Sequence, residues 1–339
     1  MNYLICQDWY NTSGNHAGIK HMCNLLTSKY PNEYKSIYFK DLLLKNKYKR
    51  FIYSRFILPV LYILFAIKLA FILKKNDRIF LLEYLDKTYP QYYIARTLKL
   101  LGKSNIIYGL IHLTPIVFTE HYKSSYIKKV LKPLNKILTL GSSLTKFIQE
   151  NDYKEKNDII TLFHYVDLEF YSKNKEISSG NPFNIIIMGC QKRNFDKIYN
   201  IIKNCKDCHF ILCKGYANIK NDFFELPNVE IHGYISEIDL KKLMDSAAVS
   251  LNVMDDTIGS NVIVTSLAMG LAMVVSDVGS IRDYCNENNS LFCNSEEEFV
   301  TAIRYLKKNP NILQTMRENS QKLALQFNIN NFHNLICNI

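Results

Sequence analysis

Short apolar runs alternate with amphipathic stretches along most of the chain, and this pattern predicts strands and helices in turn. Residues 1–170 predict strands at 3–6, 78–84, 105–112, 137–140 and 158–164, with helices at about 19–29, 90–101 and 142–151. Parallel strands need a crossover, usually a helix, between one strand and the next. The alternation therefore predicts an α/β domain with a parallel, doubly wound sheet.

The same pattern restarts after a polar segment at 171–182, YSKNKEISSGNP, which predicts a linker. Beyond it, the pattern predicts strands at 183–189, 209–213, 228–233, 249–254 and 272–276, and helices at about 196–204, 238–246, 261–269 and onward to the end. We therefore expect two Rossmann-like domains facing a cleft, at 1–170 and 183–339, with the last helix able to pack back on the first domain. Ligands of such sheets bind at the carboxyl ends of the strands. Glycines stand at or just beyond four of these ends: Gly189, Gly215, Gly233 and Gly259.

Residues 45–75 depart from this alternation, because cations there surround an unbroken apolar run at 56–67. A spanning helix needs about 20 apolar residues in a row, and Arg55 and Lys68 argue against one. Two other structures fit the segment. One is a buried amphipathic helix pair kinked at Pro59, and the other is a helix in the lipid headgroup region with its cations snorkelling.

Charge is divided unevenly along the chain. Residues 1–150 hold 23 Lys and Arg against 8 Asp and Glu, whereas the remainder holds 19 against 23. An anionic partner is therefore expected for the first half only. Because the cations of 45–75 lie among Leu, Ile and Phe, an anionic membrane surface is favoured over nucleic acid.

The cysteines and the N-terminus indicate where the protein works. Nine cysteines without regular spacing fit a reducing compartment better than a disulfide framework. The first residues, MNYLICQDWYNTSG, lack the basic and apolar regions of a signal peptide. The Cys205–His209 segment, CKDCH, matches a haem-attachment pattern, but a single Cys pair between a helix and a strand is a poor metal site. We expect no metal site and a cytoplasmic, peripheral location at the inner face of the membrane.

The stretch 255–270, DDTIGSNVIVTSLAMG, carries the most specific candidate for a ligand site. Gly259 allows close approach of the backbone, and Ser260 is a good N-cap for a helix that begins at Asn261. The first-turn amides and the helix dipole favour an anion such as a diphosphate. Lys192 and Arg193 follow another strand-ending glycine and would neutralise that charge. An ordinary capped helix and a solvated loop fit the same residues.

The second half resembles the group 1 GT-B glycosyltransferases. The resemblance is carried by IIIMGCQKRNFDKIYNII, NVEIHGYISEIDLKKLMDSAAVSLNV and NVIVTSLAMGLAMVVSDVGSIRDYC, with SLFCNSEEEFVTAI behind them. It extends more weakly into the first half through GLIHLTP, ILTLGSSLTKFI and FHYVDLEFY, in the right order. It implies a hexosyltransferase whose second domain binds a nucleotide-diphosphate sugar and whose first domain binds a glycan or lipid-linked acceptor. Retention of anomeric configuration and no cofactor or metal beyond the donor are expected.

The resemblance also implies roles for individual residues. Arg193, with Lys192, would stabilise the leaving diphosphate, and His112 would contact the transferred sugar, although a core or loop histidine fits His112 as well. Tyr234 and Ile235 would lie against the nucleobase, and Thr265 would face the ribose. The other positions implied to approach the donor or acceptor are Gly14 and Gly18 in the first loop, and Gly259, Ser260, Asn261 and Val262 through their amides.

Three positions depart from the family pattern. The family's paired acids are Thr257 and Thr265 here, and its usual Arg is Cys190. A hydroxyl binds a ribose more weakly than a carboxylate, which makes charge-assisted hydrogen bonds; Asp255 or Asp256 could substitute for the first acid. Two alternatives therefore stay open. A non-catalytic GT-B partner subunit is favoured by the missing acids, and a nucleotide-sugar epimerase on the same fold would need more carboxylates and no membrane helix.

Overall fold

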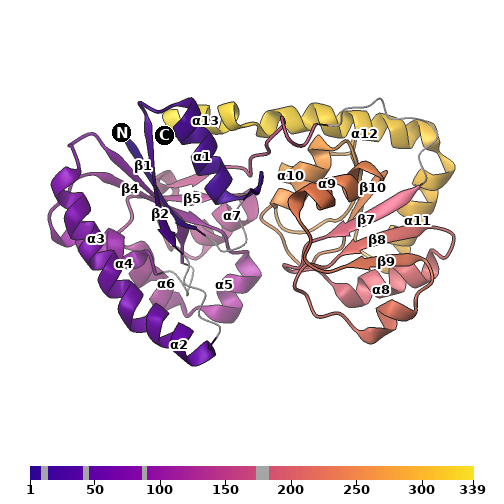
Figure 1. Cartoon of the computed structure of the whole chain (residues 1–339), viewed down its shortest axis with the longest axis horizontal. Helices are drawn as coiled ribbons and strands as arrows, with labels where there is room; N and C mark the ends of the chain where they lie inside the picture. Colours follow the sequence, from indigo (N-terminus) through magenta and orange to yellow (C-terminus); the bar gives the residue numbers. More distant parts are fainter. Residues whose placement is uncertain (9–13, 41–45, 86–89, 173–182) are drawn as a thin grey trace. The chain divides into compact units, whose positions relative to one another are not determined.

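The computed structural model describes residues 1–8, 14–40, 46–85, 90–172 and 183–339. It divides into two compact units, Met1–Phe163 together with His333–Ile339, and His164–Phe332. Each unit contains a six-stranded sheet in which all paired strands are parallel, with helices packed around it (Figure 1). The predicted α/β class is confirmed.

The first unit has the strand order β2-β1-β3-β4-β5-β6. Its strands are β1 (Asn2–Asp8), β2 (Tyr34–Lys40), β3 (Arg78–Tyr84), β4 (Ile106–Ile111), β5 (Lys136–Thr139) and β6 (Ile159–Thr161). Its helices are α1 (Ile19–Lys29), α2 (Lys47–Ile52), α3 (Leu58–Ile72), α4 (Tyr92–Leu100), α5 (Pro115–His121), α6 (Ser124–Leu131) and α7 (Ser142–Glu150). The last helix, α13 (Ile329–Cys337), begins in the second unit and ends in the first.

The second unit has the strand order β12-β11-β10-β7-β8-β9. Its strands are β7 (Asn184–Met188), β8 (His209–Cys213), β9 (Val229–His232), β10 (Val249–Asn252), β11 (Ala272–Ser276) and β12 (Ser290–Cys293). Its helices are α8 (Phe195–Asn204), α9 (Glu237–Asp245), α10 (Asn261–Ala268), α11 (Glu296–Lys308) and α12 (Pro310–Ala324).

The winding of the second sheet reverses between β7 and β10, which are neighbours although far apart in sequence. In open α/β sheets, ligands bind beyond the carboxyl ends of the strands at such a switch point. The loops that follow β7 and β10 therefore occupy the expected ligand-binding edge of this unit.

Two strands escaped the sequence pattern, β2 and β12. Both lie at an edge of their sheet, so each has a neighbouring strand on one side only. Their residues are accordingly a mixture of buried and partly exposed positions. The central strands were recognised because strands inside a parallel sheet are buried on both faces and read as continuous apolar runs. The edge strands β6 and β9 were predicted as well, so an edge position alone does not hide a strand.

The division between the units falls between Phe163 and His164, before the linker proposed at 171–182, of which 173–182 lie outside the described residues. Hydrogen bonds tie the intervening residues to the second unit. The Val166 N–H donates to Phe327 O at 2.8 Å, and the Tyr171 hydroxyl donates to Glu237 at 2.5 Å.

Residues 48–72 form one helical run, in which a π-helical turn (Tyr53–Ile57) joins α2 to α3. Pro59 lies just after this π-helical turn, where a chain that stays helical through a proline must give up one intrahelical hydrogen bond. The inward face of α3 packs on the sheet. Tyr62 is fully buried there, and its hydroxyl accepts a hydrogen bond from the side-chain amide of Gln7 on β1.

Replacing Tyr62 by Phe removes the acceptor of the buried Gln7 amide. We expect the free energy of unfolding to fall by about 1–3 kcal/mol, the cost of an unsatisfied buried donor. Tyr38→Phe is the matched control, because it removes a more exposed hydroxyl that donates to Asn24. Urea unfolding followed by circular dichroism compares the two variants, and an equal loss in both would contradict the expectation.

Candidate functional site

The loops after β7 and β10 are joined by backbone hydrogen bonds. The Asn194 N–H donates to Val253 O at 3.1 Å, and the Asp255 N–H donates to Lys192 O at 2.9 Å. Between these two bonds, Arg193 forms a β-bridge with Met254. The pairing fixes the backbone of Arg193 at the switch point of the sheet.

The guanidinium of Arg193 is buried, with the residue only 8% exposed. Its Nη2 donates to Asn252 Oδ1 at 2.8 Å, whereas its Nη1 is buried without a hydrogen-bond partner. No ion pair between Arg193 and a carboxylate is found within the described part of the chain. Burial lowers the pKa of Arg193 to about 10, so the group stays cationic at neutral pH. Because a buried charge without a counterion is costly, this arrangement points to an anionic ligand.

Gly189 brings Arg193 and the first turn of α10 together. It adopts φ 83°, and a Cβ at this position would lie 3.4 Å from Val262 Cγ2 and 3.9 Å from Arg193 Nε. A larger residue would occupy the space between the cation and the helix. The structure therefore places the predicted residues Arg193 and Val262 in one site.

The turn before α10 requires glycine at 259. Gly259 adopts φ 86°, and a Cβ there would lie 2.1 Å from the Tyr284 ring. Ser280, from the same loop as Tyr284, also contacts the turn, because its N–H donates to Thr257 O at 2.7 Å. The backbone path of this turn is thus constrained by the Tyr284 ring and by the Ser280 peptide group.

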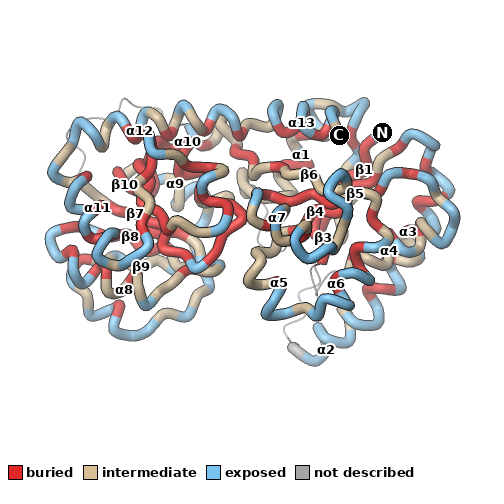
Figure 2. The backbone as a smooth tube through the Cα atoms, turned by 180° about the vertical axis from the view of Figure 1, so that it is seen from behind, coloured by how far each residue is buried: buried red, intermediate tan, exposed pale blue. Residues whose placement is uncertain are grey.

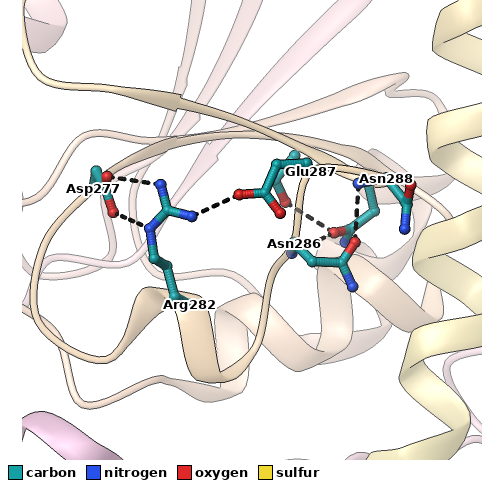
Figure 3. Close-up of polar contacts among 7 residues, drawn as sticks. Asp277, Arg282, Asn286, Glu287 and Asn288 are labelled. Carbon is teal, nitrogen blue, oxygen red and sulfur yellow. Dashed lines mark hydrogen bonds and ion pairs between the residues drawn. The ribbon is translucent and has the colours of Figure 1, made fainter.

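Tyr284 is carried by the loop after β11, which an exposed ion-pair network holds together (Figure 3). Arg282 makes two hydrogen bonds to Asp277, at 2.8 and 2.9 Å, and a third to Glu287 at 2.7 Å. Its guanidinium also lies 4.0 Å from the centre of the Phe292 ring. A bidentate pair within a network fixes geometry better than an isolated surface pair, and here it supports the loop that covers Gly259.

The backbone N–H groups of the predicted anion site differ in whether they are already hydrogen-bonded within the protein. The Gly259 N–H donates to Thr257 Oγ1 at 3.0 Å, so it is engaged within the protein. Ser260 caps the helix by accepting from the Ile263 N–H at 3.3 Å. The intrahelical bonds begin with Ile263 and Val264. The N–H groups of Asn261 and Val262 therefore project from the first turn, as at other helix N-termini.

The opposite end of α10 is held by α12. Arg317 Nε donates to Gly270 O at 3.0 Å, and Ser320 Oγ donates to Leu271 O at 2.7 Å. A cation at the carboxyl end of a helix interacts favourably with its dipole. These bonds fix the position of α10 and hence of its N-terminal amides.

The two threonines at the family's acid positions are both buried. The Thr265 hydroxyl donates to Val262 O at 3.2 Å, so toward a ribose its oxygen is left to act as an acceptor. Thr257 is engaged with Gly259, as described above. Asp256, a possible substitute for the first acid, is also buried and accepts from the Thr257 N–H at 2.8 Å.

Tyr234 is half exposed beyond β9 and stacks on Tyr216, which follows β8. Their ring centroids are 4.9 Å apart and the planes are 13° from parallel. Ile235 is partly buried beside them in sequence. Tyr216 was missed by the sequence analysis, although it directly follows the strand-end glycine at 215. Asn252 was also missed, and its signal was a polar residue at the end of an apolar strand.

The remaining predicted residues belong to the first unit and are described there by themselves. Gly14 and Gly18 adopt φ 79° and 90°, and Gly18 is the N-cap of α1. His112 follows β4 and is partly buried. Burial lowers the pKa of His112 to about 4, partly offset by a hydrogen bond with the Leu82 backbone, so the imidazole is neutral at physiological pH.

Two doubly wound units, with a cation and a helix N-terminus at the switch point of the second, are the architecture of a GT-B glycosyltransferase. Residues 193–309 match the family model described as "Glycosyl transferases group 1". This match confirms the predicted resemblance of the second unit to that family. A comparison with curated proteins finds no match.

Solved structures similar to the whole chain confirm the GT-B fold. HepE of Anabaena is 14% identical with a TM-score of 0.71, and the match covers 100% of this chain and 99% of that chain. Sucrose-phosphate synthase of Thermosynechococcus elongatus is 11% identical with a TM-score of 0.75, with the same coverage. The lipopolysaccharide outer core galactosyltransferase WaaB is 12% identical with a TM-score of 0.71, again covering 100% and 99%.

Gly259→Ala combines a left-handed backbone with overlap against the Tyr284 ring. We expect it to lower the free energy of unfolding by more than ~2 kcal/mol. Gly215→Ala is the matched control, since Gly215 has φ 55° but open space around a Cβ, and backbone strain alone costs about 1 kcal/mol. Equal destabilisation of the two variants in urea unfolding would show that Tyr284 does not constrain the turn.

His112 should make the stability of the protein depend on pH. Its pKa in the folded state, about 4, lies below the ordinary 6.5, so the unfolded chain binds the extra proton. Stability from this group is present above pH 6.5 and is lost as the pH falls toward 4, with a slope approaching ~1.4 kcal/mol per pH unit. His112→Asn should flatten the pH dependence of urea unfolding over this window. An unchanged slope would refute the depressed pKa.

Proposed function

We propose that the protein transfers a sugar from a nucleotide-diphosphate sugar to a lipid-linked or growing surface-glycan acceptor, with retention at the anomeric carbon. The observation that carries this proposal is the buried, uncompensated guanidinium of Arg193 beside the N-terminus of α10. A diphosphate supplies the negative charge that this site lacks, and it accepts hydrogen bonds from both groups.

The same groups act on the chemical step. As the bond between the sugar and the diphosphate breaks, negative charge develops on the departing phosphate oxygen. Arg193, with Lys192 from the same loop and the amides of Asn261 and Val262, stabilises that charge, and groups fixed beforehand need little reorganisation. The acceptor hydroxyl attacks from the face that the nucleotide leaves, which retains configuration.

The nucleoside part of the donor is proposed to lie toward β8 and β9. The stacked rings of Tyr216 and Tyr234 offer an aromatic surface near the carboxyl ends of these strands, and a nucleobase stacks well on such a surface. The solved structures of HepE contain UDP, UDP with glucose, and UDP-glucose. These complexes support a nucleotide sugar as the donor for this chain.

The first unit is proposed to bind the acceptor at the cytoplasmic face of the cell membrane. The excess of cations in residues 1–150 supports this placement, because the cytoplasmic leaflet carries anionic lipids. A role in surface polysaccharide synthesis follows from an acceptor presented there.

A second candidate function, a non-catalytic partner of an active transferase, is supported by the two threonines. Both occupy positions where the family has acids, and both hydroxyls are engaged in internal hydrogen bonds. Such a subunit would bind the nucleotide through Arg193 but would release no nucleotide from a nucleotide sugar. A measurement of nucleotide release therefore distinguishes the non-catalytic partner from the transferase. A measurement of nucleotide binding does not, because both would bind the nucleotide.

Arg193→Ala tests the proposed site. We expect it to lower the rate of UDP or GDP release from the cognate nucleotide sugar by ~10²–10³-fold, the range for loss of one group that stabilises developing charge. Lys206→Ala removes an exposed cation of the loop that precedes β8, at the opposite edge of the sheet, and should leave the rate unchanged.

Nucleotide binding by calorimetry completes this experiment. Wild type is expected to bind UDP or GDP, and Arg193→Ala to bind it more weakly. If Arg193→Ala binds and turns over like wild type, the diphosphate site lies elsewhere. If wild type binds the nucleotide yet shows no turnover with any lipid-linked acceptor, the non-catalytic partner replaces the transferase.

A further inference from the structure

The helical run at 48–72 has many exposed positions (Figure 2). Large apolar residues occupy most of these exposed positions. Phe71 is 88% exposed, Phe56 62% and Leu64 58%. We call this surface the outer face of α2–α3. Its apolar members are Tyr48, Phe51, Ile52, Phe56, Ile57, Val60, Leu61, Leu64, Ile67, Phe71 and Ile72.

The inward side of the same helix is equally apolar. Leu58, Tyr62, Ala66 and Leu69 are buried against the first unit. A helix that is hydrophobic all round is normally covered all round, by protein or by lipid. Half of α3 is covered by its own unit, and the outer face is solvent-exposed in the described part of the chain.

The packing of the inward side decides how a membrane can meet this helix. The run is long and apolar enough to cross a bilayer. However, Tyr62 is hydrogen-bonded to Gln7 on β1, and Phe39 of β2 packs edge-on against both Tyr62 and Phe65. A spanning helix would lose these contacts with the sheet. The helix can keep them only by lying along the membrane surface.

The charged residues around the helical run indicate what kind of surface it can contact. The sequence contains no acidic residue between Asp41 and Asp77. Exposed cations lie at both ends of the helical run and at two positions along it: Lys49, Arg50, Arg55, Lys68, Lys74 and Lys75. This arrangement is complementary to anionic headgroups. It is unfavourable for pairing with a second copy, because each copy would bring the same cations and no acids to the interface.

We infer that the outer face of α2–α3 is a docking surface for an anionic lipid monolayer. The helix axis lies parallel to the membrane, the apolar side chains enter the acyl boundary, and the flanking cations reach the phosphates. The inference does not depend on the sugar-nucleotide site. It goes beyond the proposed function by naming the residues that bind lipid and by excluding a spanning orientation.

Vesicle flotation of the full chain tests this surface. Wild type is expected to float with phosphatidylcholine vesicles that contain phosphatidylglycerol, and more weakly at high salt or with phosphatidylcholine alone. Leu64→Glu with Phe71→Glu should lower the partition coefficient by at least about tenfold, because two charges enter the apolar boundary. The matched control is Phe224→Glu with Ile238→Glu, which changes two exposed apolar residues of the second unit.

Charge and orientation are tested separately. Lys74→Glu with Lys75→Glu should weaken binding to the anionic vesicles and leave the weak binding to phosphatidylcholine unchanged. In Phe71→Trp, the new fluorescence should be quenched by lipids brominated near the headgroup end of the acyl chain, and Phe224→Trp should not be quenched. Alkaline carbonate should release the bound protein, as it does for proteins that do not span the bilayer.

Four results would overturn the inference. They are a wild type that does not float, a double Glu variant that floats like wild type, resistance to carbonate, and flotation that is indifferent to anionic lipid. Light scattering, which measures the oligomeric state, tests the alternative that a second copy of this chain covers the outer face. A dimer that the Leu64→Glu and Phe71→Glu pair dissociates, in a protein that does not bind vesicles, would assign the outer face to a second copy of this chain.

Discussion

The burial of Arg193 without a counterion is the constraint on which the second unit depends. Its guanidinium is held by one hydrogen bond to Asn252 at the end of β10, and its backbone by pairing with the loop that follows that strand. An isolated buried cation destabilises a fold, and an anionic ligand, as proposed above, would supply the missing charge. The glycine at 189 and the first turn of α10 then fit around this cation.

The neighbouring turn shows how such a site works without the acids of the family. Thr257 and Thr265 use their hydroxyls inside the protein, one to receive the Gly259 amide and the other to bond its own helix. In the proposed site, ligand binding would be left mainly to Arg193 and to the projecting amides of Asn261 and Val262. Such a site would recognise a diphosphate strongly and a ribose weakly, because its charge-assisted contacts would all lie on the phosphate side.

In the first unit, the feature that needs explanation is helix α3, which is apolar on both its buried and its exposed side. Helix α3 contributes one apolar side to the core of its own unit and presents another outward, so its sequence serves two interfaces at once. This arrangement would suit the proposed transfer of sugars to lipid-linked acceptors. The helix that stabilises the fold would also keep the protein at the surface where its acceptor is found.

The sequence by itself determined the fold class and most of its elements, because central strands buried on both faces read as apolar runs whatever their partners. It also identified Arg193 and the α10 turn as candidates, through residue types that bind anions. The edge strands β2 and β12 were missed, whereas the edge strands β6 and β9, which are also partly exposed, were predicted. Only the tertiary structure showed that Arg193 is buried, because its partner Asn252 is 59 residues away. Which side of residues 48–72 is buried was likewise decided by packing, since a helix that is apolar on every side carries no signal for which side its own protein covers.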